Sequence, residues 1–162
     1  MNAQHPSITR VKEFLAEHDI EVEVRSLSET ARTALDAANA LGVEVGQIAS
    51  SIVFSIPEPL LVITSGRHRV DTDFVANSNA LPKLGRADAD FVKNSSGFVI
   101  GGVSPVGWLK DGQIYQPRTF IDTALSEYEQ IWAAAGHTHV VFRTNFADLM
   151  RITGATPIPV EP

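Results

Sequence analysis

The chain contains no cysteine among its 162 residues. This absence excludes disulfide bonds, thiolate metal sites and cysteine nucleophiles, and it suits a reducing compartment. No apolar run approaches the ~18 residues that a membrane-spanning helix needs. The first residues also lack the basic and apolar regions of a signal peptide. We therefore expect a cytoplasmic protein without a membrane partner.

Basic residues are too few for a protein that binds nucleic acid by charge alone. The 13 lysine and arginine residues stand against 19 aspartate and glutamate residues, which gives a formal net charge of −6. Proteins that hold nucleic acid by neutralising phosphates are usually basic. Any nucleic-acid contact must therefore be local, weak or assisted by a partner. Residues 67–69 form a small basic cluster that is either a solvated loop or a phosphate contact, and Lys83 and Arg86 are candidates to join it.

Familiar catalytic and metal-binding signatures are also missing. The chain has no nucleophile elbow and no Walker loop. His137 and His139 form the only close histidine pair, and two histidines without a third ligand at suitable spacing are a weak metal signal. Paired acids such as Asp71 and Asp73 suit helix starts, where they act as caps. We expect no metal and no cofactor.

The apolar pattern predicts one domain over residues 1–162. Hydrophobic residues make up 44% of the chain, which is enough for a proper core. Predicted helices and strands do not alternate strictly, so we predict an α+β fold with a mixed, largely antiparallel sheet covered by helices. Periodicity predicts helices at 7–18, 33–41, 72–79, 88–94, 124–135 and one capped by Asn145, and strands at 21–27, 46–54, 60–63, 98–100, 114–121, 140–142 and 158–160.

The most distinctive stretch is the glycine-rich segment 97–107, which holds four glycines and a proline in an apolar run. Glycine lets the main chain approach a ligand closely, and Pro105 biases Ser104 towards an extended conformation. Main-chain N–H groups in such a bend can converge on one oxygen atom and stabilise an oxyanion. A plain tight turn between two strands is the alternative interpretation.

Three segments, 30–42, 46–54 and 96–107, resemble the YbaK/prolyl-tRNA synthetase-associated domain family, the free-standing relatives of a synthetase editing domain. The resemblance runs from about residue 8 to the C-terminus, and its most specific part is Gly-Gly-Val-Ser-Pro-Val-Gly at 101–107. It implies a barrel-like mixed sheet surrounded by helices. It also implies a trans-editing deacylase that hydrolyses a wrong amino acid from a tRNA, most often the proline tRNA, without a metal. The implied partners are the acceptor end of aminoacyl-tRNA and, as a candidate, prolyl-tRNA synthetase.

The resemblance also indicates a departure in the site. Relatives usually carry a lysine after the Ile-Ala pair, where this chain has Ser50. Serine offers only a neutral hydroxyl in place of the lysine charge. Three explanations are open: a nearby cation such as Arg32 or Arg67 replaces the lysine, the protein edits a different aminoacyl-tRNA, or it has lost the activity. A binder of aminoacyl-tRNA or of another small ligand is the alternative function. The implied catalytic residues are Ser50, Gly101 and Gly102, and the implied substrate-binding residues are Thr30, Ser51, Ile52, Val103, Ser104, Pro105, Gly136 and His137.

Overall fold

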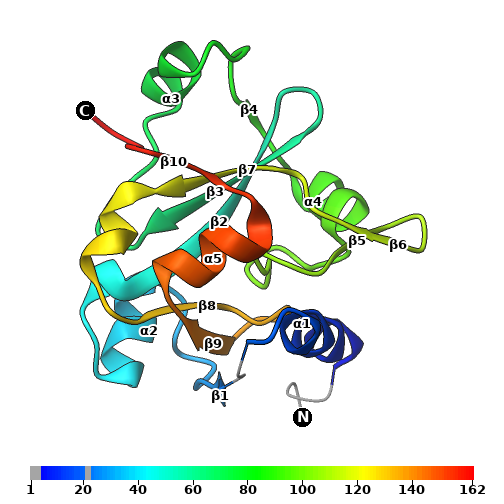
Figure 1. Ribbon diagram of the computed structural model, residues 1–162, viewed down its shortest axis with the longest axis vertical. Coiled ribbons are helices and arrows are strands. Elements are labelled where there is room, and N and C mark those ends of the chain that lie inside the picture. Colours follow the sequence, from blue (N-terminus) through cyan, green and yellow to red (C-terminus); the bar gives the residue numbers. More distant parts are fainter. Residues whose placement is uncertain (1–4, 21–22) are drawn as a thin grey trace.

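The main sheet is built around one long antiparallel pair, β2 (Ile48–Ser55) and β3 (Pro59–Ser65). The computed structural model describes residues 5–20 and 23–162, and within these residues the sheet has eight strands (Figure 1). Their order is β1-β9-β8-β2-β3-β7-β10, with β4 pairing β2. Three parallel pairings, β2–β8, β3–β7 and β7–β10, make this a mixed, mostly antiparallel sheet, as predicted. The other strands are β1 (Val24–Ser26), β4 (Gly85–Arg86), β7 (Arg118–Asp122), β8 (Ile131–Ala134), β9 (Val140–Thr144) and β10 (Thr156–Ile158), and β5 (Trp108–Lys110) and β6 (Gln113–Tyr115) form a separate hairpin.

Helices cover the sheet, and several of their ends carry residues that helix capping favours. Asp71 and Asn145 cap α3 and α5 by accepting a main-chain N–H. Gly42, Gly97 and Gly154 end α2, α4 and α5 in the left-handed conformation that glycine adopts most easily. No helix in the described part of the chain is long and apolar enough to cross a membrane. The helices are α1 (Pro6–Glu17), α2 (Ala34–Leu41), α3 (Thr72–Ser78), α4 (Ala89–Ser96) and α5 (Phe146–Thr153), with short 3-10 turns η2 (Val45–Gln47) and η3 (Thr123–Glu127).

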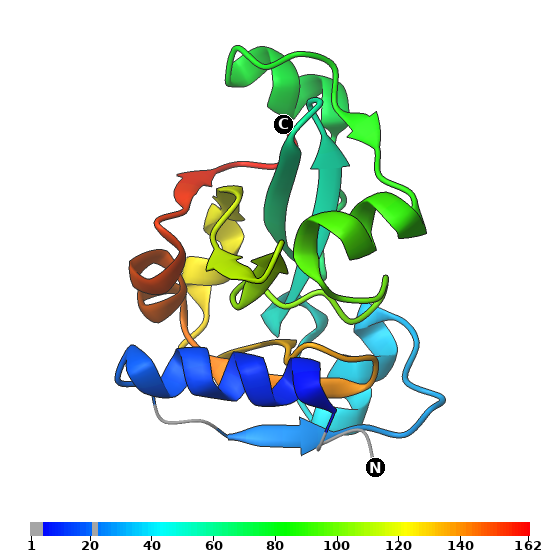
Figure 2. The ribbon, with the colours of Figure 1, turned by 90° about the vertical axis from the view of Figure 1, so that its right-hand side faces the viewer.

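The side chains of β2 are divided between two faces of the sheet. Ala49 and Val53 belong to the largest apolar cluster, which also contains buried residues of α1 and α5. Phe54 packs against a second cluster beside α3, and Ile48 lies in a third cluster beside α2. Figure 2 shows α1 crossing the end of the molecule that carries β8 and β9, with α3 at the opposite end. Successive residues of β2 therefore face different surroundings, as the alternation of a strand requires.

The predicted strand at 98–100 is wrong. These residues form a turn after α4 in which the Gly102 N–H donates to the Val99 carbonyl oxygen at 3.0 Å. Gly97 and Gly101 flank the turn with φ of 78° and 88°. Within the described residues no strand pairs with 98–100, so this apolar segment gains no ladder hydrogen bonds and turns instead.

The predicted helix at 124–135 is also wrong. Residues there form η3 and then β8, which pairs in parallel with β2 and antiparallel with β9. The apolar residues Leu125, Ile131 and Trp132 fit a helical spacing, but Leu125 is buried on η3, whereas Ile131 and Trp132 are buried on β8. A strand between two neighbours is apolar on both faces, so its sequence cannot be told from a buried helix by periodicity.

Several predicted boundaries are corrected by local chemistry. The strand at 114–121 is interrupted before Arg118, because Pro117 has no N–H for a ladder. Helix α1 is capped by His5, and Ser7, the first residue of the predicted helix, donates its buried hydroxyl to the Gly136 carbonyl oxygen. The strand predicted at 21–27 lies partly outside the described residues and is seen as β1. The strand predicted at 46–54 is observed at 48–55, and the strand predicted at 158–160 is observed two residues earlier, at 156–158.

Candidate functional site

The main sheet is open along one edge of β2. On one side β2 pairs with β3 over residues 49–55. On the other side β8 pairs with residues 48–49 and β4 with residues 54–55. Within the described residues no strand pairs with 50–53 on that side. A pocket of about 620 Å³ lies along this opening.

Ser51 presents unpartnered polar groups to the opening. The Gly66 N–H donates to the Ile48 carbonyl oxygen at 2.8 Å, which fixes the even-numbered residues of β2 as those bonded to β3. The main-chain groups of Ser51 therefore face the opening. The Ser51 Oγ is shielded from solvent and has no hydrogen-bond partner among the described residues. Buried polar groups are usually paired, so Ser51 marks a position where a ligand can complete the bonding.

The pocket is lined from both faces of β2, because it passes around the open edge. Ser51 and Val53 line the inner part, where the wall is apolar. Ser50 and Ile52 line the outer part, and Ile52 is 38% exposed. The inner wall is completed by Ala49, Val92, Val103 and Val140, and the outer wall by Ala34, Ala37, Phe54, Thr72, Leu84 and Trp132.

The two glycines of the predicted amide cradle have different surroundings. Gly101 lines the pocket, and its N–H makes no hydrogen bond to another described residue. The Gly102 N–H is held in the turn to Val99. A Cβ on Gly102 would lie 2.7 Å from the carbonyl carbon of His137 and 2.8 Å from the Thr138 nitrogen. The structure thus places Gly101 at the pocket and gives Gly102 a packing position that only glycine fits.

The structure brings together about half of the residues that the sequence proposes for the site. Ser50, Ser51, Ile52, Gly101, Val103 and His137 all line the pocket. The residues that do not line it are Thr30, Gly102, Ser104, Pro105 and Gly136.

The remaining sequence candidates have structural contacts. Ser104 is fully buried, and its carbonyl oxygen accepts the Trp108 indole N–H at 2.8 Å. The Pro105 carbonyl accepts from the Gln116 side chain at 3.0 Å. Gly136 has φ of 103° and lies against the start of α1. Thr30 is exposed, and its hydroxyl lies 3.0 Å from the Ser28 hydroxyl. These contacts shape the walls of the site from outside it.

His139 also lines the pocket, although sequence reasoning considered it only as half of a weak metal-binding pair. Its Nδ1 lies 3.1 Å from the Ala31 carbonyl oxygen, which can only accept, so Nδ1 carries the proton. Its main chain has φ of 63° and accepts the Leu27 N–H. These two bonds hold the 27–33 loop, including Arg32, against the pocket. No group of three or more metal-ligating side chains occurs in residues 5–20 and 23–162.

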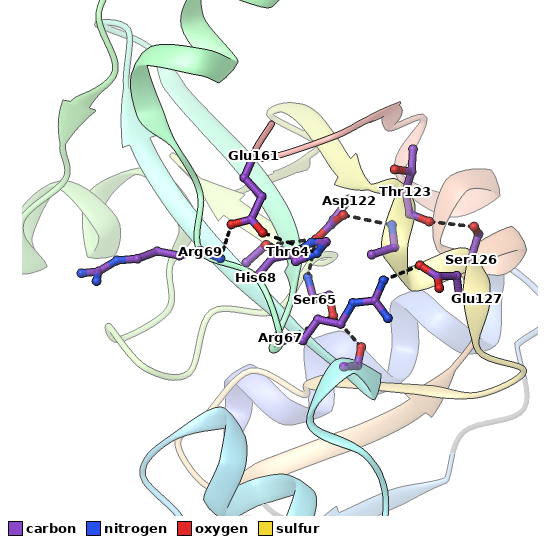
Figure 3. Close-up of polar contacts among 12 residues, drawn as sticks. Thr64, Ser65, Arg67, His68, Arg69, Asp122, Thr123, Ser126, Glu127 and Glu161 are labelled. Carbon is purple, nitrogen blue, oxygen red and sulfur yellow. Dashed lines mark hydrogen bonds and ion pairs between the residues drawn. The ribbon is translucent and has the colours of Figure 1, made fainter.

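The three side chains of the basic cluster at 67–69 point in different directions (Figure 3). The Arg67 guanidinium turns away to Glu127 at 2.5 Å and to the Tyr128 hydroxyl at 3.0 Å, and it does not line the pocket. His68 places Nδ1 2.9 Å from the buried carboxylate of Asp122. The cations that line the pocket are instead Arg32 and Arg86, both exposed.

Asp122 organises the turn that follows β3. One carboxylate oxygen accepts the Ser65 N–H at 3.0 Å and contacts His68. The other accepts the Ala124 N–H at 3.0 Å and so begins η3. A carboxylate that is 1% exposed and accepts several hydrogen bonds fixes the path of residues 65–69 beside the sheet (Figure 3).

Comparison with known proteins gives the class of this molecule. The model of the aminoacyl-tRNA editing domain matches residues 28–152, and the chain belongs to this family. A solved structure of a candidate trans-editing enzyme for prolyl tRNA synthetase is 33% identical, with 98% of each chain covered and a TM-score of 0.88.

Two further structures share the fold. One was solved in work on epitope backbone grafting, a computational design of scaffold proteins that present linear epitopes. It is 33% identical to this chain, covers 97% of this chain and 98% of its own, and has a TM-score of 0.87. The other, a hypothetical protein, is 21% identical over 93% and 98% of the two chains, with a TM-score of 0.78, and supports the fold alone. The search of curated proteins gave no match.

Proposed function

We propose that this protein hydrolyses the ester that joins a wrong amino acid to the terminal ribose of a tRNA, most readily the proline tRNA. Membership of the aminoacyl-tRNA editing domain family supplies the substrate class. The observation that carries the proposal is the open edge of β2, where a pocket of about 620 Å³ meets the unpartnered groups of Ser51 and Gly101.

The reaction needs donors for a developing negative charge. Water adds to the ester carbonyl carbon, the carbonyl oxygen becomes an oxyanion, and the bond to the ribose oxygen then breaks as that oxygen takes a proton. The N–H groups of Ser51 and Gly101 and the Ser51 hydroxyl are donors of the required kind. The family resemblance implies that a ribose hydroxyl of the tRNA helps to place the water, so no protein base is assigned.

The inner wall sets the size of the amino acid that enters. Val53, Val92, Val103 and Val140 line the apolar part of the pocket beside Ser51. An apolar wall separates side chains that differ by one methylene by only about 1–3 kcal/mol. We therefore expect several small amino acids to be accepted rather than a single one.

A cation near the outer wall replaces the family lysine in this proposal. Ser50 lies at that position and carries no charge. Arg32 and Arg86 line the same pocket. A guanidinium remains charged at all working pH values and binds phosphate oxygens in pairs, so either residue can supply the missing positive charge.

The test is release of amino acid from mischarged tRNA. Purified protein is incubated with alanyl-, cysteinyl-, seryl- and threonyl-proline tRNA, and released amino acid is followed against buffer alone. We expect faster release from at least one of these esters. Release at the spontaneous rate from the whole set would refute the deacylase.

A second function is favoured by Ser50 itself. A member without the lysine could bind aminoacyl-tRNA without turning it over. This version predicts tight binding of charged tRNA with no release by the native protein. It also predicts that the Ser50→Lys variant gains hydrolysis. Hydrolysis of the same esters by the native protein would exclude this second function.

A further inference from the structure

A second hollow lies next to the pocket and shares one wall with it. This hollow has a volume of about 370 Å³. Both spaces are lined by Ser50, Ile52 and Phe54, the outward side chains of β2, which we call the shared floor. The second hollow is bounded on its far side by the end of β3 and by residues of the 66–70 segment that follows it. A ligand that fills the pocket can therefore continue across the floor.

Three arginines surround this floor. Arg32 and Arg86 line the pocket, and Arg69 lines the second hollow. All three are exposed, and none makes an ion pair within 4.0 Å to any described residue. By contrast, the arginines that do form ion pairs lie elsewhere: Arg25, Arg67, Arg143 and Arg151.

Two acidic groups near this rim, Asp36 and Glu161, accept hydrogen bonds from main-chain donors. Asp36 accepts the N–H groups of Arg32 and Thr33, and these hydrogen bonds hold the pKa of the Asp36 carboxyl below its usual range. Glu161 accepts the Arg69 N–H at 3.4 Å. In Figure 3 the Arg69 side chain extends away from the carboxylates. The guanidinium groups are thus left for a ligand from outside.

The floor itself has the chemistry of a stacking surface. Ile52 is 38% exposed, and Phe54 is partly exposed beside it. Bases of single-stranded nucleic acid stack on apolar and aromatic side chains, while their phosphates pair with arginine. A floor with cations on both sides matches a strand that alternates bases and phosphates. The net charge of −6 makes such a local cluster necessary for binding a polyanion.

We propose that the shared floor and its three arginines bind the single-stranded acceptor end of the tRNA. The terminal nucleotide occupies the pocket between Arg32 and Arg86. The strand then leaves across Ile52 towards Arg69 in the second hollow. This assignment rests on the proposed function for the identity of the ligand, and it adds the direction of the strand and the residues that hold its phosphates.

The test is the salt dependence of binding to deacylated proline tRNA. Each phosphate contact to a single strand contributes about 0.7 to the slope of log K against log salt. Arg69→Gln is expected to lower the slope by about 0.7, and the triple Arg32, Arg69 and Arg86 to glutamine variant by about 2. Arg118→Gln is the matched control, because Arg118 is exposed, forms no ion pair with a described residue and lines neither space.

The outcomes separate this inference from the proposed function. The phosphate site would be overturned if the arginine variants kept the wild-type salt slope, or if the slope of Arg118→Gln fell as much as that of Arg69→Gln. Either result would count even if the protein hydrolyses charged tRNA. The expected slopes without hydrolysis of any ester would leave the phosphate site supported and refute the deacylase. No binding of tRNA by the native protein at low salt would refute both.

Discussion

Replacement of Ser51 by alanine is expected to raise stability and lower activity at the same time. The hydroxyl of Ser51 is buried without a partner in the described residues. An unsatisfied buried polar group costs about 1–3 kcal/mol, so removing it leaves the free energy of unfolding unchanged or up to that much higher. If the hydroxyl donates to the oxyanion, its loss slows ester cleavage by about 10²-fold.

Ser65→Ala is the matched control for this change. Ser65 lies on the neighbouring strand, is fully buried, and donates its hydroxyl to the Gly46 carbonyl oxygen at 2.8 Å. Its removal leaves that carbonyl unpaired and should lower the free energy of unfolding by about 1–3 kcal/mol.

Urea denaturation and single-turnover deacylation of a mischarged proline tRNA measure the two effects separately. A Ser51→Ala variant that is destabilised as much as the control, and that keeps the wild-type rate, would refute a catalytic role for the Ser51 hydroxyl. Ser51 would then be an ordinary packing residue.

Three further predictions concern the frame around the site. Gly136→Ala should lower the free energy of unfolding by roughly 2–5 kcal/mol, because its φ is 103° and a Cβ would lie 2.7 Å from the Ser7 carbonyl oxygen; an unchanged denaturation midpoint would contradict this. Asp122→Asn should cost about 2–4 kcal/mol through the loss of charge-assisted hydrogen bonds, and a near-neutral value by the same measurement would contradict it. Burial raises the pKa of Tyr115, whose hydroxyl donates to the Ser95 carbonyl; the unfolded chain ionises first, so stability falls as pH rises above ~10. Denaturation between pH 8 and 11 should show a smaller fall for Tyr115→Phe, and parallel curves would be the contrary result.

The fold class was accessible from the sequence because local signals agree with the global arrangement. Asp71 and Asn145 cap helices, and Gly42 and Gly154 end them, as residue chemistry requires. Segment 124–135 could not be assigned, because its strand exists only through pairing with β2 and β9. A buried strand of this kind carries no alternation that distinguishes it from a helix.

The residues of the candidate site could be predicted from the sequence only in part, for a similar reason. The resemblance places Ser50, Ser51 and Gly101 near one another, and the structure puts all three on the pocket. The open edge of β2 depends on where two distant short strands stop pairing, which no local pattern encodes. Arg86 reaches the pocket on β4, one of these short strands, and His139 reaches it from the turn between β8 and β9. Their residue types were visible in the sequence, but their positions were not.

A structure of the protein with a stable amide analogue of alanyl-adenosine would test the proposed site directly. We expect the analogue to lie along the open edge of β2, with its carbonyl oxygen about 2.7–3.1 Å from donors of Ser51 and Gly101. An analogue bound elsewhere, or bound here with the Ser51 hydroxyl still unpartnered, would contradict it.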